Sequence, residues 1–524
     1  MGVCSVCGFR WEGEEDKEPI ETCPKCGSLL NISNEHSHFD FRIPNDLREF
    51  IEICESEREL KRIKAQVDWY LELAHIAKLN EERSGPALLF ENVKGYSTAV
   101  LTSAYTKPSR VAIALGMDRN SGTVDIAHEW MKRVTESPGL IKPKKVSDGP
   151  VLENRMEGED VDLAKFPVPQ LYPEDGGRYF GTTAYLITRD PETGYVNLGV
   201  YRMQMLDGKS LGLQLLKGKD AEVMLNKYRE LGRPMPAVAV IGGSPLGFLV
   251  GSTLVPYGTS EYEVIGALQG KAVEVIESDL TGLPIPANAE IAVEGFVDPE
   301  NFRAEGPFGE YTGYYSGKAQ EEFPKPWLEV KRIFYRDSPI FWTTTVGRPV
   351  TDTHMVQSIN RTAELWTQLQ RMGVPGIQSV YIPPESTGRF WVIVSIKQLY
   401  PGHGRHAGLA VFATVLGNYG VKGVIVVDED IRADDLPRVW WALSVRYNPV
   451  EDTEMIKKGR STPLDPSLPA YADYYDHRHI VSRILIDATT PYEWKKKPTV
   501  IELDREVIQK LKERWNEFEF EWTP

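Results

Sequence analysis

The sequence predicts an α+β protein in which a β-rich middle region is flanked by two α/β regions. Residues 151–336 read as short strands separated by frequent Gly and Pro, which is typical of a partly closed β-barrel. Residues 40–150 and 340–495 instead combine helical periodicity with short apolar runs. The ends stand apart, because residues 1–32 are rich in cysteine and residues 500–524 read as a charged amphipathic helix.

Length and charge limit the classes of function. The chain has 524 residues, enough for several domains with sizeable cores. Its 60 basic and 75 acidic residues give a net charge of −15, which disfavours nucleic acid and anionic membranes as partners. No stretch approaches the ~18 apolar residues of a membrane span, and the N-terminus lacks a signal-peptide pattern. We therefore expect a cytoplasmic protein.

Four of the five cysteines lie within the first 26 residues. Cys4, Cys7, Cys23 and Cys26 form two C-x-x-C-G knuckles, with a spacing that suits one four-thiolate metal site. The module resembles zinc-ribbon and rubredoxin-like knuckles. Thiolates suit both metals, so structural zinc and electron-transferring iron remain open.

The flanking α/β regions predict specific elements. A helix is expected to begin near Asn45 or Asp46, which are favourable N-cap residues. The other expected elements are a helical pattern over 60–80, strands at 87–90, 97–101, 390–397 and 422–428, a polar linker at 142–149, and a helix over 504–520 that docks on this chain or another subunit. The Gly-rich basic turn at 400–406 predicts either an anion site at a helix start or an ordinary surface turn.

Two strands of the β-rich region carry polar residues of interest. In the strand 195–202, Asn197 and Arg202 face opposite ways unless Gly199 introduces a bulge. In the strand 272–277, Glu274 is flanked by valines and faces away from them, as a solvent-exposed strand glutamate also would.

The segment 301–315 holds the strongest catalytic candidate. Glu305 and Glu310 bracket a Gly-Pro-Phe-Gly sequence, which favours a turn that brings both carboxylates to one site. Two carboxylates at close range do not both ionise easily, so one of them has a raised pKa and carries a proton. The alternative is an acidic surface loop, against which the surrounding aromatic residues argue.

Five segments together resemble the UbiD-like decarboxylase family over roughly residues 40–500. They are NLGVYR (197–202), AVEVIESDL with PANAEI (272–291), EGPFGEYTGY (305–314), SIKQLYPGH (395–403) and VIVVDEDI (424–431). The resemblance implies a central split β-barrel flavin domain between α/β domains. It also implies reversible, non-oxidative decarboxylation of an aromatic or α,β-unsaturated acid with prenylated FMN, which a flavin prenyltransferase supplies. A homo-oligomer, dimer or hexamer, is expected.

The resemblance also implies roles for individual residues. Arg202, Glu305 and Glu310 match the family's catalytic network, with Glu310 as the proton donor. Asn197 and Glu274 match ligands of a divalent cation, Mn2+ or Mg2+, that bridges to the flavin phosphate, and K+ is a further candidate ion. The residues implied to hold the cofactor are Asn197, Val200, Tyr201, Arg202, Gln214, Leu215, Lys217 and Glu274.

The sequence departs from the family at one metal ligand. Many members carry a histidine shortly after the NxxxxR motif, whereas residues 210–223 contain none. Lys217 could meet the phosphate directly, or Asp220 could replace the histidine. The competing functional hypotheses are a flavin redox protein that receives electrons from iron at the four cysteines, and an interaction protein without catalysis.

Overall fold

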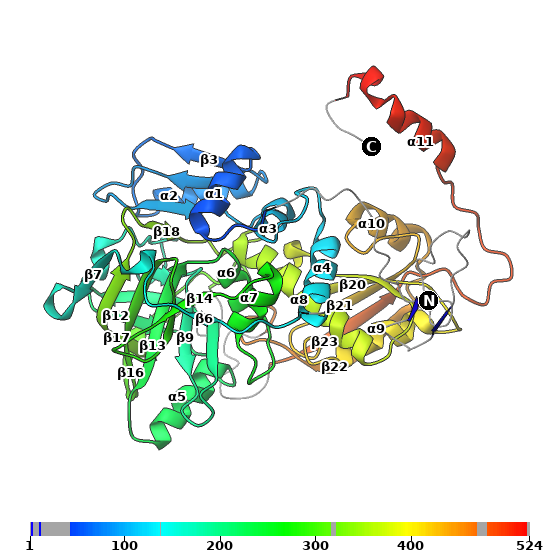
Figure 1. Cartoon of the computed structure of the whole chain (residues 1–524). Coiled ribbons are helices and arrows are strands. Elements are labelled where there is room, and N and C mark those ends of the chain that lie inside the picture. Colours follow the sequence, from blue (N-terminus) through cyan, green and yellow to red (C-terminus); the bar gives the residue numbers. More distant parts are fainter. Residues whose placement is uncertain are drawn as a thin grey trace.

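The computed structural model describes residues 2–3, 10–11, 42–136, 138–315, 321–468 and 479–520 (Figure 1). Strands β1 (Gly2–Val3) and β2 (Arg10–Trp11) form a short antiparallel pair. The predicted cysteine metal site lies outside the described residues. Among the described residues, no helix is both long and apolar enough to cross a membrane.

The first α/β region contains a four-stranded sheet in the order β18-β5-β4-β3. Its elements are α1 (Leu47–Ser56), β3 (Leu60–Ile63), α2 (Glu72–Glu81), β4 (Ala87–Phe90), β5 (Ala99–Thr102), α3 (Pro108–Ala114), α4 (Thr123–Thr135) and, from later in the chain, β18 (Ile340–Trp342). Asp46 caps α1 as predicted, since its Oδ1 accepts a hydrogen bond from Glu49 N at 3.0 Å. The helical prediction over 60–80 is wrong for Leu60–Ile63, because that segment pairs with β4 and the sheet overrides local periodicity.

The middle region is a nearly closed, barrel-like sheet in the order β10-β9-β13-β16-β17-β12-β11-β8, with β7 beside β17. Its strands are β7 (Asn154–Glu157), β8 (Tyr179–Gly181), β9 (Tyr185–Arg189), β10 (Val196–Val200), β11 (Met203–Asp207), β12 (Ser210–Leu213), β13 (Met235–Gly242), β16 (Ala289–Glu305) and β17 (Phe323–Tyr335). The helices α5 (Asp220–Glu230), α6 (Leu246–Gly251) and α7 (Glu261–Gln269) accompany it. The loop between the long strands β16 and β17 carries Glu310.

A separate three-stranded sheet lies beside the barrel. It contains β6 (Lys144–Lys145), β14 (Glu274–Glu277) and β15 (Pro284–Pro286) in the order β15-β14-β6. The stretch 142–149, expected to be a linker, therefore supplies one strand of this sheet.

The second α/β region contains a five-stranded sheet in the order β19-β20-β21-β23-β22. Its elements are α8 (Asp352–Arg371), β19 (Ile377–Tyr381), β20 (Trp391–Ile396), α9 (His403–Ala413), β21 (Gly423–Asp428), α10 (Leu436–Val445), β22 (Thr453–Arg460) and β23 (Ile480–Asp487). The predicted strands at 390–397 and 422–428 are confirmed as the parallel pair β20 and β21. Helix α11 (Arg505–Glu513) extends away from the body and has no buried residue (Figure 1).

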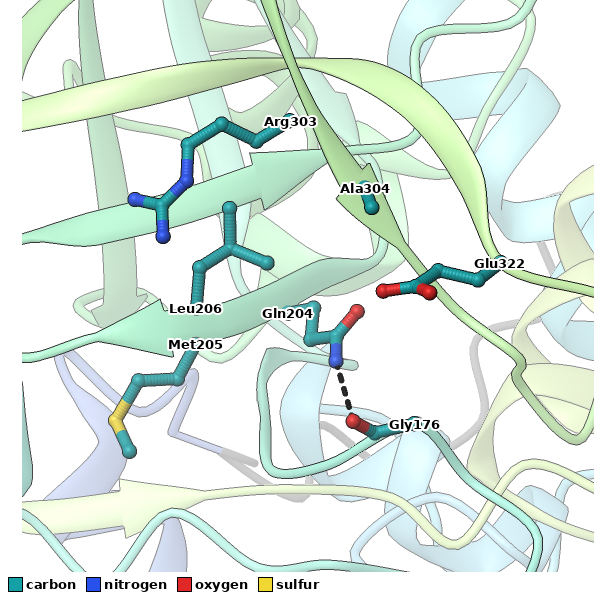
Figure 2. Close-up of a pocket in the computed structure, with 7 residues that line it drawn as sticks. All are labelled: Gly176, Gln204, Met205, Leu206, Arg303, Ala304 and Glu322. Atoms are coloured by element: carbon teal, nitrogen blue, oxygen red, sulfur yellow. Dashed lines mark hydrogen bonds between the residues drawn. The ribbon is translucent and has the colours of Figure 1, made fainter.

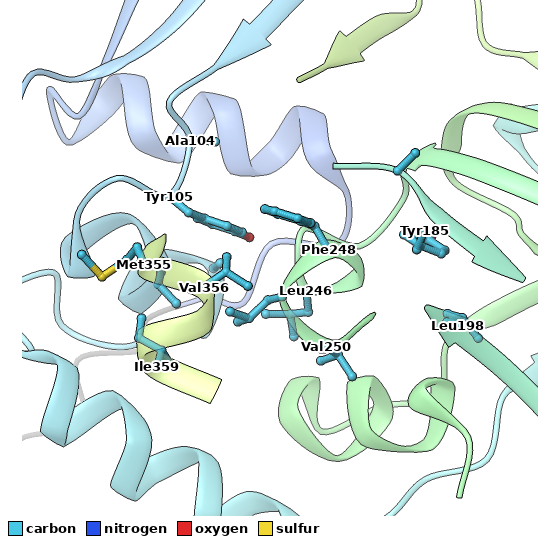
Figure 3. Close-up of a cluster of buried hydrophobic side chains, with 14 of the residues drawn as sticks. Ala104, Tyr105, Tyr185, Leu198, Leu246, Phe248, Val250, Met355, Val356 and Ile359 are labelled. Carbon is cyan, nitrogen blue, oxygen red and sulfur yellow. The ribbon is translucent and has the colours of Figure 1, made fainter. Parts of the chain in front are cut away.

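One cluster of buried hydrophobic side chains, which includes Tyr105, Phe248 and residues of α8, joins the three regions (Figure 3). Tyr105 follows β5, Phe248 lies on α6 and Trp342 ends β18, and the ring of Trp342 lies 5.3 Å from that of Tyr105 and 5.6 Å from that of Phe248. The buried Tyr105 hydroxyl donates to the Pro245 carbonyl at 2.6 Å. Apolar residues of α8 face the same cluster, so α8 is fixed against the barrel.

Candidate functional site

Three charged side chains meet where β10 and β16 end. Arg202 lies two residues beyond β10, Glu305 is the last residue of β16, and Glu310 lies in the following loop. Arg202 Nε and Nη2 donate to Glu305 at 2.9 and 2.8 Å, and Nη1 donates to Glu310 Oε1 at 2.6 Å. The prediction that a turn brings both glutamates to Arg202 is confirmed in its geometry.

Burial makes this cluster electrostatically asymmetric. The side chains of Glu305 and Glu310 are 0% and 10% exposed, and one guanidinium faces both. Burial raises the pKa of Glu310, and the charge of Glu305 raises it further against the opposing effect of Arg202. Arg202 makes a two-point contact with Glu305, which favours the ionised form of that carboxylate. Glu310 is therefore the carboxyl of the pair that holds a proton more readily.

The turn that carries Glu310 is fixed by backbone contacts. Gly306 has φ +100°, a conformation that L side chains rarely adopt, and its N–H donates to Gln204 Oε1 at 2.7 Å. Gly309 N donates to Asp175 Oδ1 at 2.9 Å. The Phe308 ring lies 5.1 Å from the Arg202 guanidinium carbon, so the turn also covers the cation.

A buried histidine holds the chain just beyond Glu310. Thr351 N donates to His354 Nδ1 at 3.0 Å, which leaves Nε2 to donate to the Tyr311 carbonyl at 2.6 Å. Burial lowers the pKa of His354 to about 4, so the imidazole is neutral at physiological pH and keeps this tautomer. His354 was not singled out from the sequence, because its partner is a backbone atom 43 residues away.

A cavity of about 410 Å³ lies beside the turn that leads to Glu310, and Figure 2 draws the residues that line it. Its lining residues are Gly176, Gln204, Met205, Leu206, Arg303, Ala304 and Glu322. Gln204 spans its wall, since Nε2 donates to the Gly176 carbonyl at 2.8 Å while Oε1 accepts from Gly306. The lining does not include Arg202, Glu305 or Glu310, so this cavity is distinct from the cluster of these three side chains.

The structure does not bring Glu274 to Asn197. Glu274 lies on β14 of the separate small sheet, its side chain is 55% exposed, and it pairs with Lys144 at 2.9 Å. Asn197 lies buried on β10. The alternation argument correctly placed Glu274 opposite its valines, but that face is solvent. The expectation that Glu274 binds the metal ion and the cofactor is therefore corrected: Glu274 lies on a solvent-exposed face away from Asn197.

The carboxylate beside Asn197 is Glu261, at the start of α7. Its Oε2 accepts from Leu198 N at 2.8 Å, and burial raises its pKa to about 8, with a further contribution from Asp220. Asp220 begins α5, where Tyr195 Oη donates to it at 3.1 Å. The Nδ2 atom of Asn197 is buried without a partner in the described structure. Two carboxylates and one amide thus gather at this point.

Sequence reasoning missed Glu261 because nothing local marks it. The residue reads as one of two acids in the first turn of an ordinary helix. Its burial and its bond to Leu198 arise only when α7 packs against β10. Among the described residues, no group of three or more His, Cys, Asp or Glu side chains is arranged to hold a metal ion.

The other residues expected at the cofactor have mixed placements. No bulge occurs at Gly199, since the register with β9 is regular; Arg202 is reoriented because the strand ends at Val200. Tyr201 is buried and accepts from Ala221 N at 3.3 Å. Gln214 N donates to the Arg202 carbonyl at 3.2 Å, and Gln214 Oε1 is buried without a partner in the described structure. Leu215 follows in the same turn and is half-buried.

Lys217, which was expected to hold the cofactor, lies exposed in the turn before α5, and a contact of Lys217 with the phosphate stays a prediction. The predicted anion site at 400–406 does become a helix start, α9. Its His403 is already engaged, because Nδ1 accepts from Leu399 N at 3.2 Å and Nε2 donates to the Pro375 carbonyl at 3.0 Å. Of the two alternatives, an anion site or an ordinary surface turn, these contacts favour the ordinary turn.

The sequence matches three domains of one family along almost the whole described chain. Residues 51–130, 143–349 and 354–488 match, in order, the N-terminal, Rift-related and C-terminal domains of 3-octaprenyl-4-hydroxybenzoate carboxy-lyase (UbiD). An uncharacterized protein of Archaeoglobus fulgidus is 33% identical over 494 residues, which cover 90% of this chain and 98% of that protein.

Solved structures agree with these matches. The open form of vanillic acid decarboxylase from Sedimentibacter hydroxybenzoicus is 32% identical, with a TM-score of 0.81, over 90% of this chain and 99% of that one. The UbiD-class enzyme HmfF from Pelotomaculum thermopropionicum, in complex with FMN, is 28% identical, with a TM-score of 0.79, over 88% of this chain and 98% of that one.

Proposed function

The chain belongs to the UbiD family of carboxy-lyases, and from this premise we propose that it decarboxylates an aromatic or α,β-unsaturated carboxylic acid. The reaction is reversible and involves no net oxidation, and its cofactor is prenylated FMN. Similarity to HmfF, which was solved with FMN and, in an evolved dimeric form, with prFMN, supports this cofactor.

The observation that carries the proposal is the Arg202–Glu305–Glu310 cluster. Loss of CO2 from an sp² carbon leaves an electron pair that must be accepted and a carbon that must be protonated. The bound flavin supplies the electron sink. Glu310 supplies the proton, because its burial raises its pKa and keeps it protonated more readily than a surface glutamate.

Arg202 and Glu305 have a positioning role in this scheme. The two-point contact with Glu305 fixes the guanidinium plane, so the third donor, Nη1, holds Glu310 at 2.6 Å. His354 fixes the next carbonyl and thereby limits movement of Glu310. In the carboxylation direction Glu310 accepts the proton that the same carbon loses.

The residues beside Asn197 fit a divalent cation. Asn197, Asp220 and Glu261 offer hard oxygen donors, which Mn2+ and Mg2+ prefer, and Asn197 Nδ2 is buried without a hydrogen-bond partner in the described structure. We assign the cation that neutralises the cofactor phosphate to these residues in place of the pair Asn197 and Glu274.

The proposal is tested with protein coexpressed with a flavin prenyltransferase. We expect CO2 release from at least one member of a panel of hydroxybenzoic and cinnamic-type acids, with deuterium from D2O incorporated at the vacated carbon. Protein expressed without the prenyltransferase is the control and should be inactive. If cofactor-loaded protein releases CO2 from no member and exchanges no proton, the proposed function is wrong.

A further inference from the structure

Arg361 and Arg389 lie near Tyr311, and the charges of both act on a third cation, Lys219. None of these three cations forms an ion pair in the described part of the chain. Charged groups removed from water are normally paired, because an unpaired buried charge is costly. The catalytic cluster does not use these three residues. An unpaired buried cation group indicates a place where an anion binds.

Arg361 is the most buried of the three. It lies on α8, seven residues after His354, so both residues face the Glu310 loop from one side of the helix. The residue is 9% exposed, and its Nε is buried with no hydrogen-bond partner among the described residues. Burial and the neighbouring Arg389 lower its pKa to about 9, which still leaves it charged at neutral pH.

Arg389 approaches the same place from the segment before β20. Its guanidinium carbon lies 5.0 Å from the Tyr311 ring and 5.9 Å from the Tyr419 ring. Gln357, one helical turn before Arg361, accepts from Arg389 Nη2 at 3.1 Å. Arg389 is therefore held by α8 and lies near both tyrosine rings, while Nε of Arg361 on the same helix has no partner among the described residues.

Lys219 is the third cation, and it lies at the start of α5, beside the barrel. It immediately precedes Asp220 at the start of α5, and both arginines lie near enough for their charges to act on its ammonium. The Lys219 side chain is exposed in this structure. Its charge also acts on Asp220, so Lys219 connects the two arginines with the oxygen donors beside Asn197.

We propose that Lys219, Arg361 and Arg389 bind the phosphate monoester of the flavin mononucleotide. This inference rests on the proposed function. A phosphomonoester carries about −1.5 to −2 charges at pH 7, which suits three cations better than one substrate carboxylate would. Guanidinium groups bind phosphate oxygens in pairs. The position beside the cation ligands lets one phosphate meet both groups.

The test compares binding of FMN and of riboflavin, which lacks the phosphate, to cofactor-free full-length protein by flavin fluorescence quenching with Mn2+ present. Wild type should bind FMN more tightly than riboflavin. Arg361→Gln should weaken FMN binding by about 10–100-fold and leave riboflavin binding unchanged, since only the phosphate contact is lost. Arg438→Gln is the matched control, because Arg438 is 60% exposed and pairs only with Asp435 in the described structure.

The outcomes separate this inference from the proposed function. Wild-type protein that binds neither flavin would contradict the proposed function itself. FMN affinity that is unchanged in Arg361→Gln would overturn the phosphate site alone. An unchanged FMN affinity with a raised KM for the acid would assign the cluster to the substrate carboxylate and likewise overturn it. Arg389→Gln, at a partly exposed residue, provides the same comparison if Arg361→Gln does not fold.

Discussion

Two charged clusters meet at Tyr311, and their charge balance is opposite. On one side, Arg202 alone faces the carboxylates of Glu305 and Glu310. On the other side, Lys219, Arg361 and Arg389 gather without an ion pair in the described structure. Tyr311 connects the two clusters, because it directly follows Glu310 in the chain and its ring lies against Arg389.

This difference in charge balance underlies the roles that we propose for the two clusters. Surplus negative charge in a buried site is relieved by a proton, so the first cluster holds an acid. Surplus positive charge cannot be relieved in this way at arginine, whose guanidinium stays charged, so the second cluster needs an anion. The following predictions test this contrast, from the largest expected effect to the smallest.

Glu310→Gln should reduce turnover by about 10²–10⁴-fold, because the amide keeps the shape of the side chain but has no transferable proton. FMN binding should not change. The measurement is the rate of CO2 release together with H/D exchange at the substrate carbon. Glu329→Gln, at a residue 51% exposed and paired with Lys331, is the control. Exchange at the wild-type rate in Glu310→Gln would transfer the acid role to Glu305 or to water.

Arg202→Met should lower the free energy of unfolding by about 3–5 kcal/mol, because it leaves Glu305 buried without its cation. Adding Glu305→Gln to this variant should recover much of the loss. Urea unfolding of the cofactor-free proteins measures both effects. If the single and double variants unfold at the same urea concentration, the buried ion pair is not the source of the loss.

Glu261→Gln should weaken Mn2+ binding by at least about 10–100-fold, whereas Glu274→Gln should leave it unchanged. The two glutamates lie 13 positions apart, but only Glu261 is buried beside Asn197. Because the pKa of Glu261 is raised to about 8 in the metal-free protein, protons compete with the cation, and Mn2+ affinity should fall as pH falls below that value. Equal loss in both variants would contradict this reassignment.

The two clusters should also differ in pH dependence. Glu310 donates a proton only in its neutral form, so turnover should be full below its pKa and fall up to about tenfold per pH unit above it. The groups that act on this carboxyl are Arg202 and Glu305, with burial as the largest effect. FMN affinity should not follow the titration of Glu310, since that carboxyl is not among the groups proposed to contact the phosphate and Arg361 is still charged at neutral pH. Parallel pH profiles for turnover and FMN binding would remove the distinction between the clusters.

The turn between Glu305 and Glu310 could be predicted from sequence because its information is local. Only four residues separate Glu305 from Glu310, and Gly and Pro between them specify the turn. The strands β20 and β21 were predictable for a similar reason, since a continuous apolar run marks a strand buried on both faces. In contrast, Leu60–Ile63 could not be assigned correctly, because its pairing partner is β4.

The sequence by itself determined the three-region order, the family resemblance and the Arg202–Glu305–Glu310 set. Only the tertiary structure decided that Glu261 rather than Glu274 lies beside Asn197, and that Lys219, Arg361 and Arg389 lie together. These residues come from α5, α7, α8 and the segment before β20, and no periodicity or motif links them. The physical reason is that burial and the sum of neighbouring charges set the role of a charged side chain, and both depend on packing between distant elements.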